Sequence, residues 1–422
     1  MTQPNTPINL TPEHLLTVYQ ISTWINSTLD FDSVLNNVMD AIMQVTKAQR
    51  GFLMIHDENT NTLQVLVARG IDGATIDSEG FSTTIVSKVV ETQETLLTNN
   101  AEFDNRFSAG QSIIMRGLRA ILCAPMMVGD RLIGVVYVDT SMKAGVFRPD
   151  DLGVLNAVSG IASRALENAR LYKVAREKGR LEHELHMASQ IQRSLLPRQM
   201  PSTHYYQIAP HWEAAREVAG DFYDAFDLGD NSFGTVIADV SDKGAPAALF
   251  MAVTRTLLRA NAALGVNPAD TVRRTNDMLL SDAEESGMFV TVFYSYFTAA
   301  GLAVHVNAGH NPPVLYRKAA NTVEFLPIGG RALGWFPDNP VKVTETQLNP
   351  GDVIVYYTDG LTDAENYQGE PFAEERLSQS VMRHVFKDAD SIKLGILDDV
   401  AAHCEGNSPF DDLTMLIVKF VG

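Results

Sequence analysis

The spacing of apolar residues predicts two helices near the start of the chain. Thr11 can cap the first helix by accepting hydrogen bonds from free backbone N–H groups, and Pro12 suits the first helical position. The second helix is expected to begin near Asp32 or Ser33. The apolar positions at helical spacing are Leu15, Val18, Ile21 or Tyr19, and Ile25 in the first helix, and Val34, Leu35, Val38 and Ile42 in the second.

The pattern then changes to strands, and two hairpins are predicted from pairs of apolar runs that flank turn-forming residues. The first hairpin is expected from residues 51–55 and 63–67, and the second from residues 120–128 and 132–138. Pro125 has no backbone N–H to donate, so it indicates a sheet edge or a bulge in the second hairpin.

A long helix is predicted from Asp151 to Leu196, because no proline occurs between Pro149 and Pro197. Its apolar residues recur at steps of 4, 3, 3 and 4, at Leu181, Leu185, Ala188, Ile191 and Leu195. This spacing is close to a coiled-coil seam with a phase slip. We expect residues 171–197 to be a signalling helix that joins two domains and pairs with a second copy. The alternative is a single helix that lies on one domain.

Aspartates gather beside strand-like runs in the last half of the chain. Four short acidic segments stand there: Gly220–Asp224, Asp239–Gly244, Thr358–Gly360 and Asp411–Thr414. Carboxylates about 4 Å apart repel by about 4 kcal/mol per pair at an effective dielectric near 20, so such a cluster needs a cation. Mg²⁺ and Mn²⁺ prefer oxygen ligands. The pattern therefore predicts one metal-dependent active site.

Composition narrows the function classes. The chain has 422 residues, enough for two domains, and a formal net charge of −18 that disfavours nucleic acid and anionic membrane partners. Its two cysteines, Cys123 and Cys404, show no metal-binding spacing and no disulfide framework. Neither a signal peptide nor a long apolar run is visible, so a cytoplasmic, soluble protein is expected.

Residues 15–170 resemble a GAF domain, a sensor with an antiparallel sheet and packed helices. The resemblance rests on residues 122–126, 134–139 and 147–151 within the order of predicted elements. It implies a dimerisation module with an unidentified small-molecule ligand, preceded by a tail at residues 1–14. Cys123 lies in mid-strand, where a buried thiol is a better interpretation than chromophore attachment.

Residues 185–421 resemble the bacterial stage II sporulation protein E family, a branch of the metal-dependent type 2C phosphatases. Seven segments stand in family order: residues 192–197, 219–224, 239–244, 288–291, 307–313, 358–361 and 411–414. The resemblance implies an α+β fold for the whole chain, with a GAF domain, a linker helix and an α-β-β-α sandwich over residues 198–422.

The family resemblance also implies roles for the acidic residues. Asp239 follows the apolar run 234–238, so its carboxylate would extend from a strand end and bridge two metals. Asp224 is expected to support the ligands without contacting metal, and Asp411 is slightly favoured over Asp412. The implied metal ligands are Asp221, Asp239, the carbonyl of Val240, Asp359, and Asp411 or Asp412, with Asp221, Asp239, Asp359 and Asp411 as the catalytic set.

Other residues near these motifs have less definite roles. His310 could protonate a leaving group, although a histidine in this kind of turn more often bonds its own loop. Arg216 lies where related enzymes carry a phosphate-binding arginine, but this branch generally lacks that residue. Asp242 stands where glycine is common, and Ala219 replaces a frequent glycine.

The sequence thus predicts a serine/threonine protein phosphatase that holds two Mn²⁺ or Mg²⁺ ions and attacks phosphorus with an activated water. The resemblance implies a phosphorylated anti-sigma-factor antagonist of STAS fold as substrate, and regulation by the GAF domain. A non-catalytic signalling scaffold is the first alternative, and a small-molecule phosphatase is the second.

Overall fold

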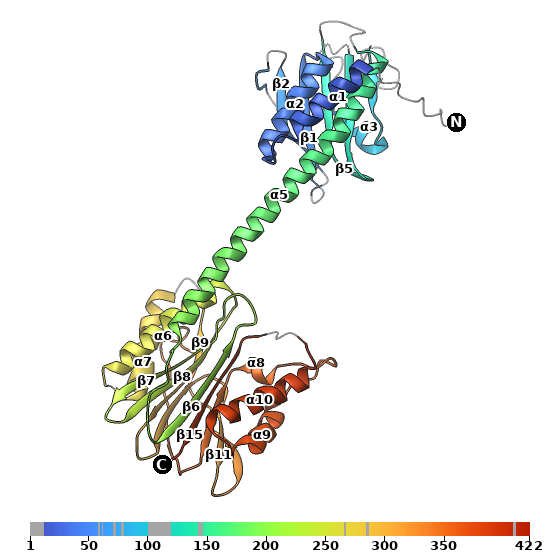
Figure 1. The fold of residues 1–422 in the computed structure, drawn as a ribbon. Coiled ribbons are helices and arrows are strands. Elements are labelled where there is room, and N and C mark those ends of the chain that lie inside the picture. Colours follow the sequence, from blue (N-terminus) through green and yellow to red (C-terminus); the bar gives the residue numbers. More distant parts are fainter. Residues whose placement is uncertain are drawn as a thin grey trace. The chain divides into compact units, whose positions relative to one another are not determined.

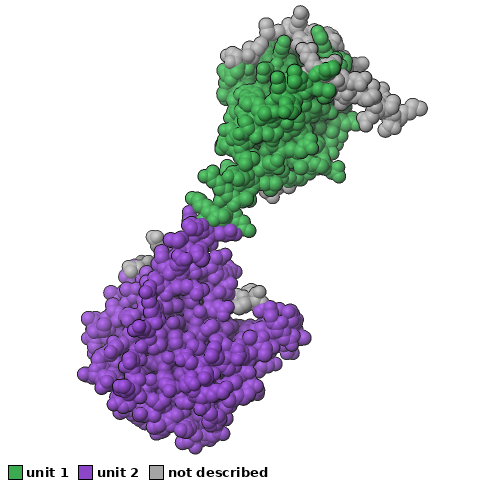
Figure 2. All heavy atoms as spheres, viewed as in Figure 1, with its two compact units in different colours: residues 1–180 green, residues 181–422 purple. Residues whose placement is uncertain are grey.

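The computed structural model describes residues 12–57, 60, 62–70, 73–76, 80–99, 120–141, 147–265, 267–283, 287–407 and 411–422. It divides into two compact units, Met1–Arg180 and Leu181–Gly422 (Figure 2). The expected cap Thr11 and the expected turn residues 58, 59 and 61 lie outside the described residues.

The first unit contains a five-stranded antiparallel sheet with the strand order β2-β1-β5-β4-β3. Its strands are β1 (Arg50–Asp57), β2 (Thr62–Gly70), β3 (Leu96–Thr98), β4 (Ala120–Val128) and β5 (Arg131–Thr140). Both predicted hairpins are confirmed, as β1 with β2 and as β4 with β5. The β4–β5 register shifts between Met126 and Met127, beside Pro125, and β3 pairs with β4 only as far as Cys123. The bulge that Pro125 indicated is therefore present.

Helices cover both faces of this sheet (Figure 1). They are α1 (Pro12–Ile25), α2 (Phe31–Thr46), α3 (Thr83–Thr92) and the first turns of α5 (Pro149–Leu195). The Asp30 side chain caps α2 by accepting a 2.9 Å bond from the Ser33 amide, so this helix begins slightly earlier than expected. Ile21 and Ile25 of α1 are buried, whereas Leu15 is 55% exposed, so only part of the expected apolar face of this helix is buried.

The predicted long helix is confirmed as α5, which runs for 47 residues without interruption. Its early residues Val154, Leu155 and Val158 belong to the core of the first unit. Two residues of the predicted seam, Leu181 and Ile191, are more than half exposed, while Gln192 and Leu196, which lie outside the seam, are buried. Within the described part of the chain, no helix is both long and apolar enough to cross a membrane.

The second unit is built from two five-stranded antiparallel sheets with the orders β13-β10-β9-β8-β7 and β12-β11-β14-β15-β6. The strands are β6 (Tyr206–Glu213), β7 (Phe222–Gly229), β8 (Ser232–Val240), β9 (Val290–Phe297), β10 (Leu302–Ala308), β11 (Val314–Arg317), β12 (Thr322–Phe325), β13 (Val343–Gln347), β14 (Val353–Tyr357) and β15 (Leu413–Phe420). Apolar side chains from both sheets share one core, as predicted for a sandwich.

One pair of helices packs on each sheet, which confirms the α-β-β-α order. Helices α6 (Ala245–Ala263) and α7 (Pro268–Ala283) contact strands β7 to β10 of the first sheet. Helices α9 (Ala373–His384) and α10 (Ala389–Cys404) contact the second sheet, and the short α8 (Asp359–Thr362) follows β14.

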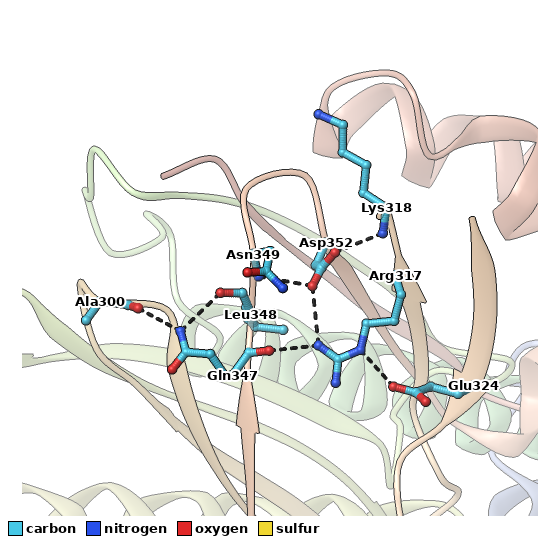
Figure 3. A network of polar contacts seen from close by, with 8 residues as sticks. All are labelled: Ala300, Arg317, Lys318, Glu324, Gln347, Leu348, Asn349 and Asp352. Atoms are coloured by element: carbon cyan, nitrogen blue, oxygen red, sulfur yellow. Dashed lines mark hydrogen bonds and ion pairs between the residues drawn. The ribbon is translucent and has the colours of Figure 1, made fainter. Parts of the chain in front are cut away.

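A polar network centred on Arg317 and Asp352 ties the two sheets together at one edge (Figure 3). The buried Asp352 carboxylate accepts bonds from the Lys318 and Asn349 amides, at 2.9 and 3.0 Å, and pairs with Arg317 at 3.3 Å. Arg317 also donates to the Gln347 carbonyl, on the other sheet, at 2.8 Å, and to the exposed Glu324 carboxylate, at 2.8 Å. The network therefore fixes the relative position of β11, β13 and β14.

Removal of Asp352 should destabilise the second unit. Asp352→Ala removes the buried acceptor of two backbone N–H groups and one of the acceptors of the Arg317 guanidinium, at a cost of about 3 kcal/mol in free energy of unfolding. Glu324→Ala removes the exposed partner of the same arginine and should cost less than about 1 kcal/mol. Denaturant unfolding of both variants measures the difference, and equal losses would contradict this account of the network.

Candidate active site

Antiparallel pairing brings the four acidic segments to one end of the sandwich. Phe222 at the start of β7 pairs with Ala238 near the end of β8, so Asp221 and Asp239 are neighbours. In the other sheet, Tyr357 at the end of β14 pairs with Met415 of β15, which places Asp359 near the residues that precede β15. Each sheet thus contributes two acidic segments.

The Asp221 carboxylate connects the two sheets. It is buried, and its Oδ2 accepts hydrogen bonds from the Thr358 hydroxyl at 2.6 Å and the Thr414 hydroxyl at 2.9 Å. Thr358 and Thr414 stand inside the acidic motifs, but no spacing in the sequence indicated this role.

Burial and mutual repulsion raise the pKa values of these carboxyl groups. Burial, followed by the charge of Asp239, holds the pKa of Asp221 well above its usual range. Burial, followed by the charge of Asp359, raises the pKa of Asp239 to about 7. Burial, followed by the charge of Asp411, raises the pKa of Asp359. The carboxylates of the site therefore carry more negative charge than the cationic side chains of the protein balance.

Asp411 and Asp412 have different surroundings. The two oxygens of Asp412 accept bonds from the Ala215 and Gly220 amides, both at 2.8 Å, so this carboxylate holds the loop before Asp221. The Asp411 carboxylate instead pairs with the Lys243 ammonium at 2.8 Å. Asp411 also accepts a 3.0 Å bond from the Asp412 amide, and its charge raises the pKa values of both Asp239 and Asp359.

Two glycines permit the close approach of the acidic segments. A Cβ at Gly360 would lie 2.0 Å from the Asp412 carbonyl oxygen, and a Cβ at Gly220 would lie 3.1 Å from the Val240 carbonyl oxygen. Any larger residue at position 360 would push α8 away from the Asp411–Asp412 turn. These positions therefore need glycine for space between two pieces of backbone.

The carboxylates provide the oxygen ligands that a hard divalent cation needs, and their raised pKa values indicate uncompensated charge. Among the described residues, however, no three His, Cys, Asp or Glu side chains already converge in a metal-binding arrangement. The chemistry of the donor set fits Mg²⁺ or Mn²⁺, while the ligand geometry is not preassembled.

Asp224 lies apart from this carboxylate group. Its buried carboxylate pairs with Arg255 at 3.0 Å and with Arg259 at 3.4 Å, both on α6. Arg259 also stacks on the Phe226 ring, with its guanidinium carbon 5.5 Å from the ring centroid. Asp224 thus attaches α6 to β7, which agrees with a supporting role and gives it a specific partner.

His310 bonds within the protein on both ring nitrogens. Its Nε2 lies 3.2 Å from the Tyr357 carbonyl, which can only accept, so Nε2–H donates and Nδ1 accepts from the Thr291 hydroxyl at 2.8 Å. Burial lowers the pKa of His310 to about 4. The ring is neutral and connects β9 to β14, which supports the loop-bonding interpretation over that of an acid.

Asp242 and Arg216 are also placed. Asp242 has a φ of 70°, a left-handed conformation that glycine adopts at no steric cost and aspartate tolerates better than most residues. This explains why glycine suits the position. Arg216 is exposed, and its side chain has no role in the arrangement of the carboxylates.

Comparison with known families matches both units. Residues 229–421 match the family model described as stage II sporulation protein E (SpoIIE), and residues 28–167 match a GAF domain model. The SpoIIE match contains Asp239, Asp359, Asp411 and Asp412 but begins after Asp221.

Individual relatives and solved structures are also similar to this chain. "Protein IcfG" of Synechocystis sp. is 31% identical over 64% of this chain and 46% of its own length, so the chain spans about half of that relative. "Phosphoserine phosphatase RsbU" of Bacillus subtilis is 26% identical over 66% of this chain and 81% of its own length. The solved SiaA-PP2C domain of Pseudomonas aeruginosa shares the fold, with a TM-score of 0.51, 22% identity and coverage of 58% of this chain and 98% of that domain.

The metal-free protein should lose stability as the pH rises. The folded-state pKa of Asp239 is about 7, above the value of about 3.9 for an unfolded aspartate. Between these values the folded state binds a proton that the unfolded state releases, so the free energy of unfolding decreases from about pH 4 to about pH 7. Asp239→Asn should therefore raise the unfolding temperature at pH 8 in chelator.

Calorimetry at pH 5 and pH 8 tests this expectation. The Asp239→Asn variant should show a smaller fall in unfolding temperature between the two pH values than the unsubstituted chain. Asp277→Asn, at an exposed position of α7, is the matched control. The same fall in both variants would rule out Asp239 as a source of the pH dependence.

Proposed function

We propose that this chain, which joins an N-terminal GAF domain to a C-terminal phosphatase domain of the stage II sporulation protein E type, is a metal-dependent protein phosphatase. Its substrate would be a phosphoserine or phosphothreonine in a regulatory protein. The observation that carries this proposal is that the segments with Asp221 and Asp239 from one sheet, and those with Asp359 and Asp411 from the other, lie at one end of the sandwich.

The residues that would hold two Mn²⁺ or Mg²⁺ ions are Asp221, Asp239, Asp359 and Asp411, with the Val240 carbonyl as a backbone ligand. The ions would supply positive charge to the phosphoryl oxygens and activate a water for attack on phosphorus. Asp412 would hold the loop before Asp221, because both of its oxygens already bond backbone amides. Thr358 and Thr414 would orient Asp221.

Lys243 gives the site a cation that can exchange partners. Its ammonium pairs with the Asp411 carboxylate, and both side chains are about one-third exposed. When Asp411 binds a metal ion, Lys243 would be available to an anionic phosphate group at the same edge. Attack by a metal-activated water needs no nucleophilic side chain from the protein. Cys123 is buried in the core of the first unit.

The substrate proposal rests on the relatives. RsbU is named a phosphoserine phosphatase and matches two thirds of this chain, and a second relative, RsbP of Bacillus subtilis, carries the same description. A phosphorylated anti-sigma-factor antagonist of STAS fold is the substrate that we propose. The GAF domain would regulate the reaction, and exposed apolar residues of α5, including Leu181 and Ile191, support a homodimer through this helix.

A non-catalytic scaffold is the second candidate, and the observation that favours it is the missing preassembled metal geometry among the described residues. The two candidates differ in turnover. A scaffold would bind the phosphorylated partner and release no phosphate at any metal concentration.

Hydrolysis of p-nitrophenyl phosphate tests the enzyme. The full chain should turn over with Mn²⁺ or Mg²⁺ and stop in chelator, and Asp239→Ala and Asp359→Ala should each lower kcat by about 100-fold or more, because each removes a cation ligand. Asp277→Ala, on the exposed face of α7, should leave the rate unchanged.

The same four proteins are then assayed on a phosphorylated STAS-fold antagonist, with phosphate release as the readout. Metal-dependent turnover of both substrates supports the enzyme with a protein substrate. Turnover of the small ester alone would exclude this protein class as substrate. Binding without turnover of either substrate would favour the scaffold.

A further inference from the structure

The last turns of α5 reach the loop that carries Asp221. Gln192 is 3% exposed, although Ile191 beside it is 60% exposed. Its side-chain amide forms two hydrogen bonds with one residue: Nε2 donates to the Ala219 carbonyl at 2.6 Å, and Oε1 accepts from the Ala219 amide at 3.0 Å. Gln192 therefore pairs with the backbone of Ala219 as a neighbouring strand would.

Arg193, the next residue of α5, makes an indirect contact with the same loop. Its guanidinium carbon lies 5.2 Å from the centroid of the Trp212 ring. The Trp212 indole N–H donates to the Asp221 carbonyl at 2.9 Å. Two consecutive helical residues thus act on the two ends of the segment Ala219, Gly220 and Asp221, which we call the Asp221 segment.

The Asp221 segment is held at each of its residues. Gln192 holds the backbone of Ala219, Asp412 accepts from the Gly220 amide, and Trp212 donates to the Asp221 carbonyl. The Gly220 backbone also leaves little space beside the Val240 carbonyl. A small shift of Ala219 would therefore be transmitted to Asp221 and to the neighbouring Val240.

We propose that Gln192 is a positioning residue that couples the linker helix α5 to the candidate metal site through the Asp221 segment. A helix is stiff along its axis, and α5 continues without interruption from the core of the first unit to Gln192. Displacement of its last turn would move Ala219 and change how well Asp221 can serve as a ligand.

This inference rests on the proposed function, because it takes Asp221 to be a metal ligand. It assigns the regulatory input to the contact between Gln192 and Ala219. The contact is separate from the ion pair of Asp224 with Arg255, which attaches α6 to β7. Loss of a side chain that orients a metal ligand typically weakens metal binding by about 10-fold to 100-fold.

The first measurement needs no activity. In the full chain without metal, hydrogen exchange followed by mass spectrometry should show faster exchange of residues 213–222 in Gln192→Met than in the unsubstituted chain. An increase of about tenfold at the Ala219 amide is expected, because its buried acceptor is lost. Methionine keeps the side-chain volume, so the packing of the helix is retained.

Gln190→Met is the matched control, because Gln190 is an exposed glutamine of the same helix. If Gln192→Met changes the unfolding temperature, Gln192→Ala is measured in its place. If exchange in residues 213–222 is the same in the Gln190 and Gln192 variants, Gln192 does not position the segment and the proposal is overturned.

The second measurement is Mn²⁺ binding by isothermal titration calorimetry. Gln192→Met should weaken binding by about tenfold, while Gln190→Met should not. Coupling is reciprocal, so Mn²⁺ should slow exchange of residues 190–196 in the unsubstituted chain and have little effect there in Gln192→Met. Equal Mn²⁺ affinity in both variants, or equal protection of these residues, would overturn the coupling.

The two proposals fail separately. A chain that binds Mn²⁺ but hydrolyses no phosphoester would contradict the phosphatase proposal, while the calorimetric and exchange comparisons would still decide the coupling. A chain that binds no Mn²⁺ would contradict both the metal-dependent function and the coupling to metal. Normal turnover, together with equal hydrogen exchange and equal Mn²⁺ affinity in the Gln190 and Gln192 variants, would contradict the coupling alone.

Discussion

Repulsion among carboxylates that are buried together is the constraint on which the rest of the second unit depends. Unsatisfied negative charge is costly in a partly buried site, so each carboxylate needs a proton, a hydrogen-bond donor or a cation. The chain supplies hydroxyls from Thr358 and Thr414 to Asp221, backbone amides to Asp412, and Lys243 to Asp411. The remaining repulsion and burial still raise the pKa values of Asp221, Asp239 and Asp359, and a divalent cation is the species that would balance their charge.

The sequence indicated the helices, strands and acidic segments of this arrangement more clearly than the contacts between them. Apolar periodicity predicted the hairpins of the first unit, its first two helices and the unbroken helix α5, because each of these depends on local spacing. The acidic segments could be found because each lies beside a strand. Their pairing across two sheets was implied by family resemblance, since antiparallel register between distant strands is decided by contacts that no local window contains.

The details that sequence reasoning left open are those decided by neighbours that are distant in the chain. Asp411 and Asp412 are adjacent and chemically identical, yet the Ala215 and Gly220 amides engage only the second. Asp224 was expected to support the site, but its partners on α6 could not be identified from spacing. Leu15 fits a helical stripe and is still exposed, because periodicity shows which side of a helix is apolar and not how far the core extends.

The position of Gln192 shows why the linker is more than a spacer. An apolar residue at a buried helical position could pack in several orientations, whereas a glutamine that pairs with one peptide group fixes both distance and rotation. Leu181 and Ile191 of the predicted seam are exposed, while Gln192 and Leu196 are buried within the second unit. One face of α5 is thus engaged by its own chain and another carries exposed apolar residues, so a partner helix could bind the second face without displacing the first. In the proposed homodimer, rotation of α5 would act on Ala219 through a directional pair of hydrogen bonds, which apolar packing alone could not provide.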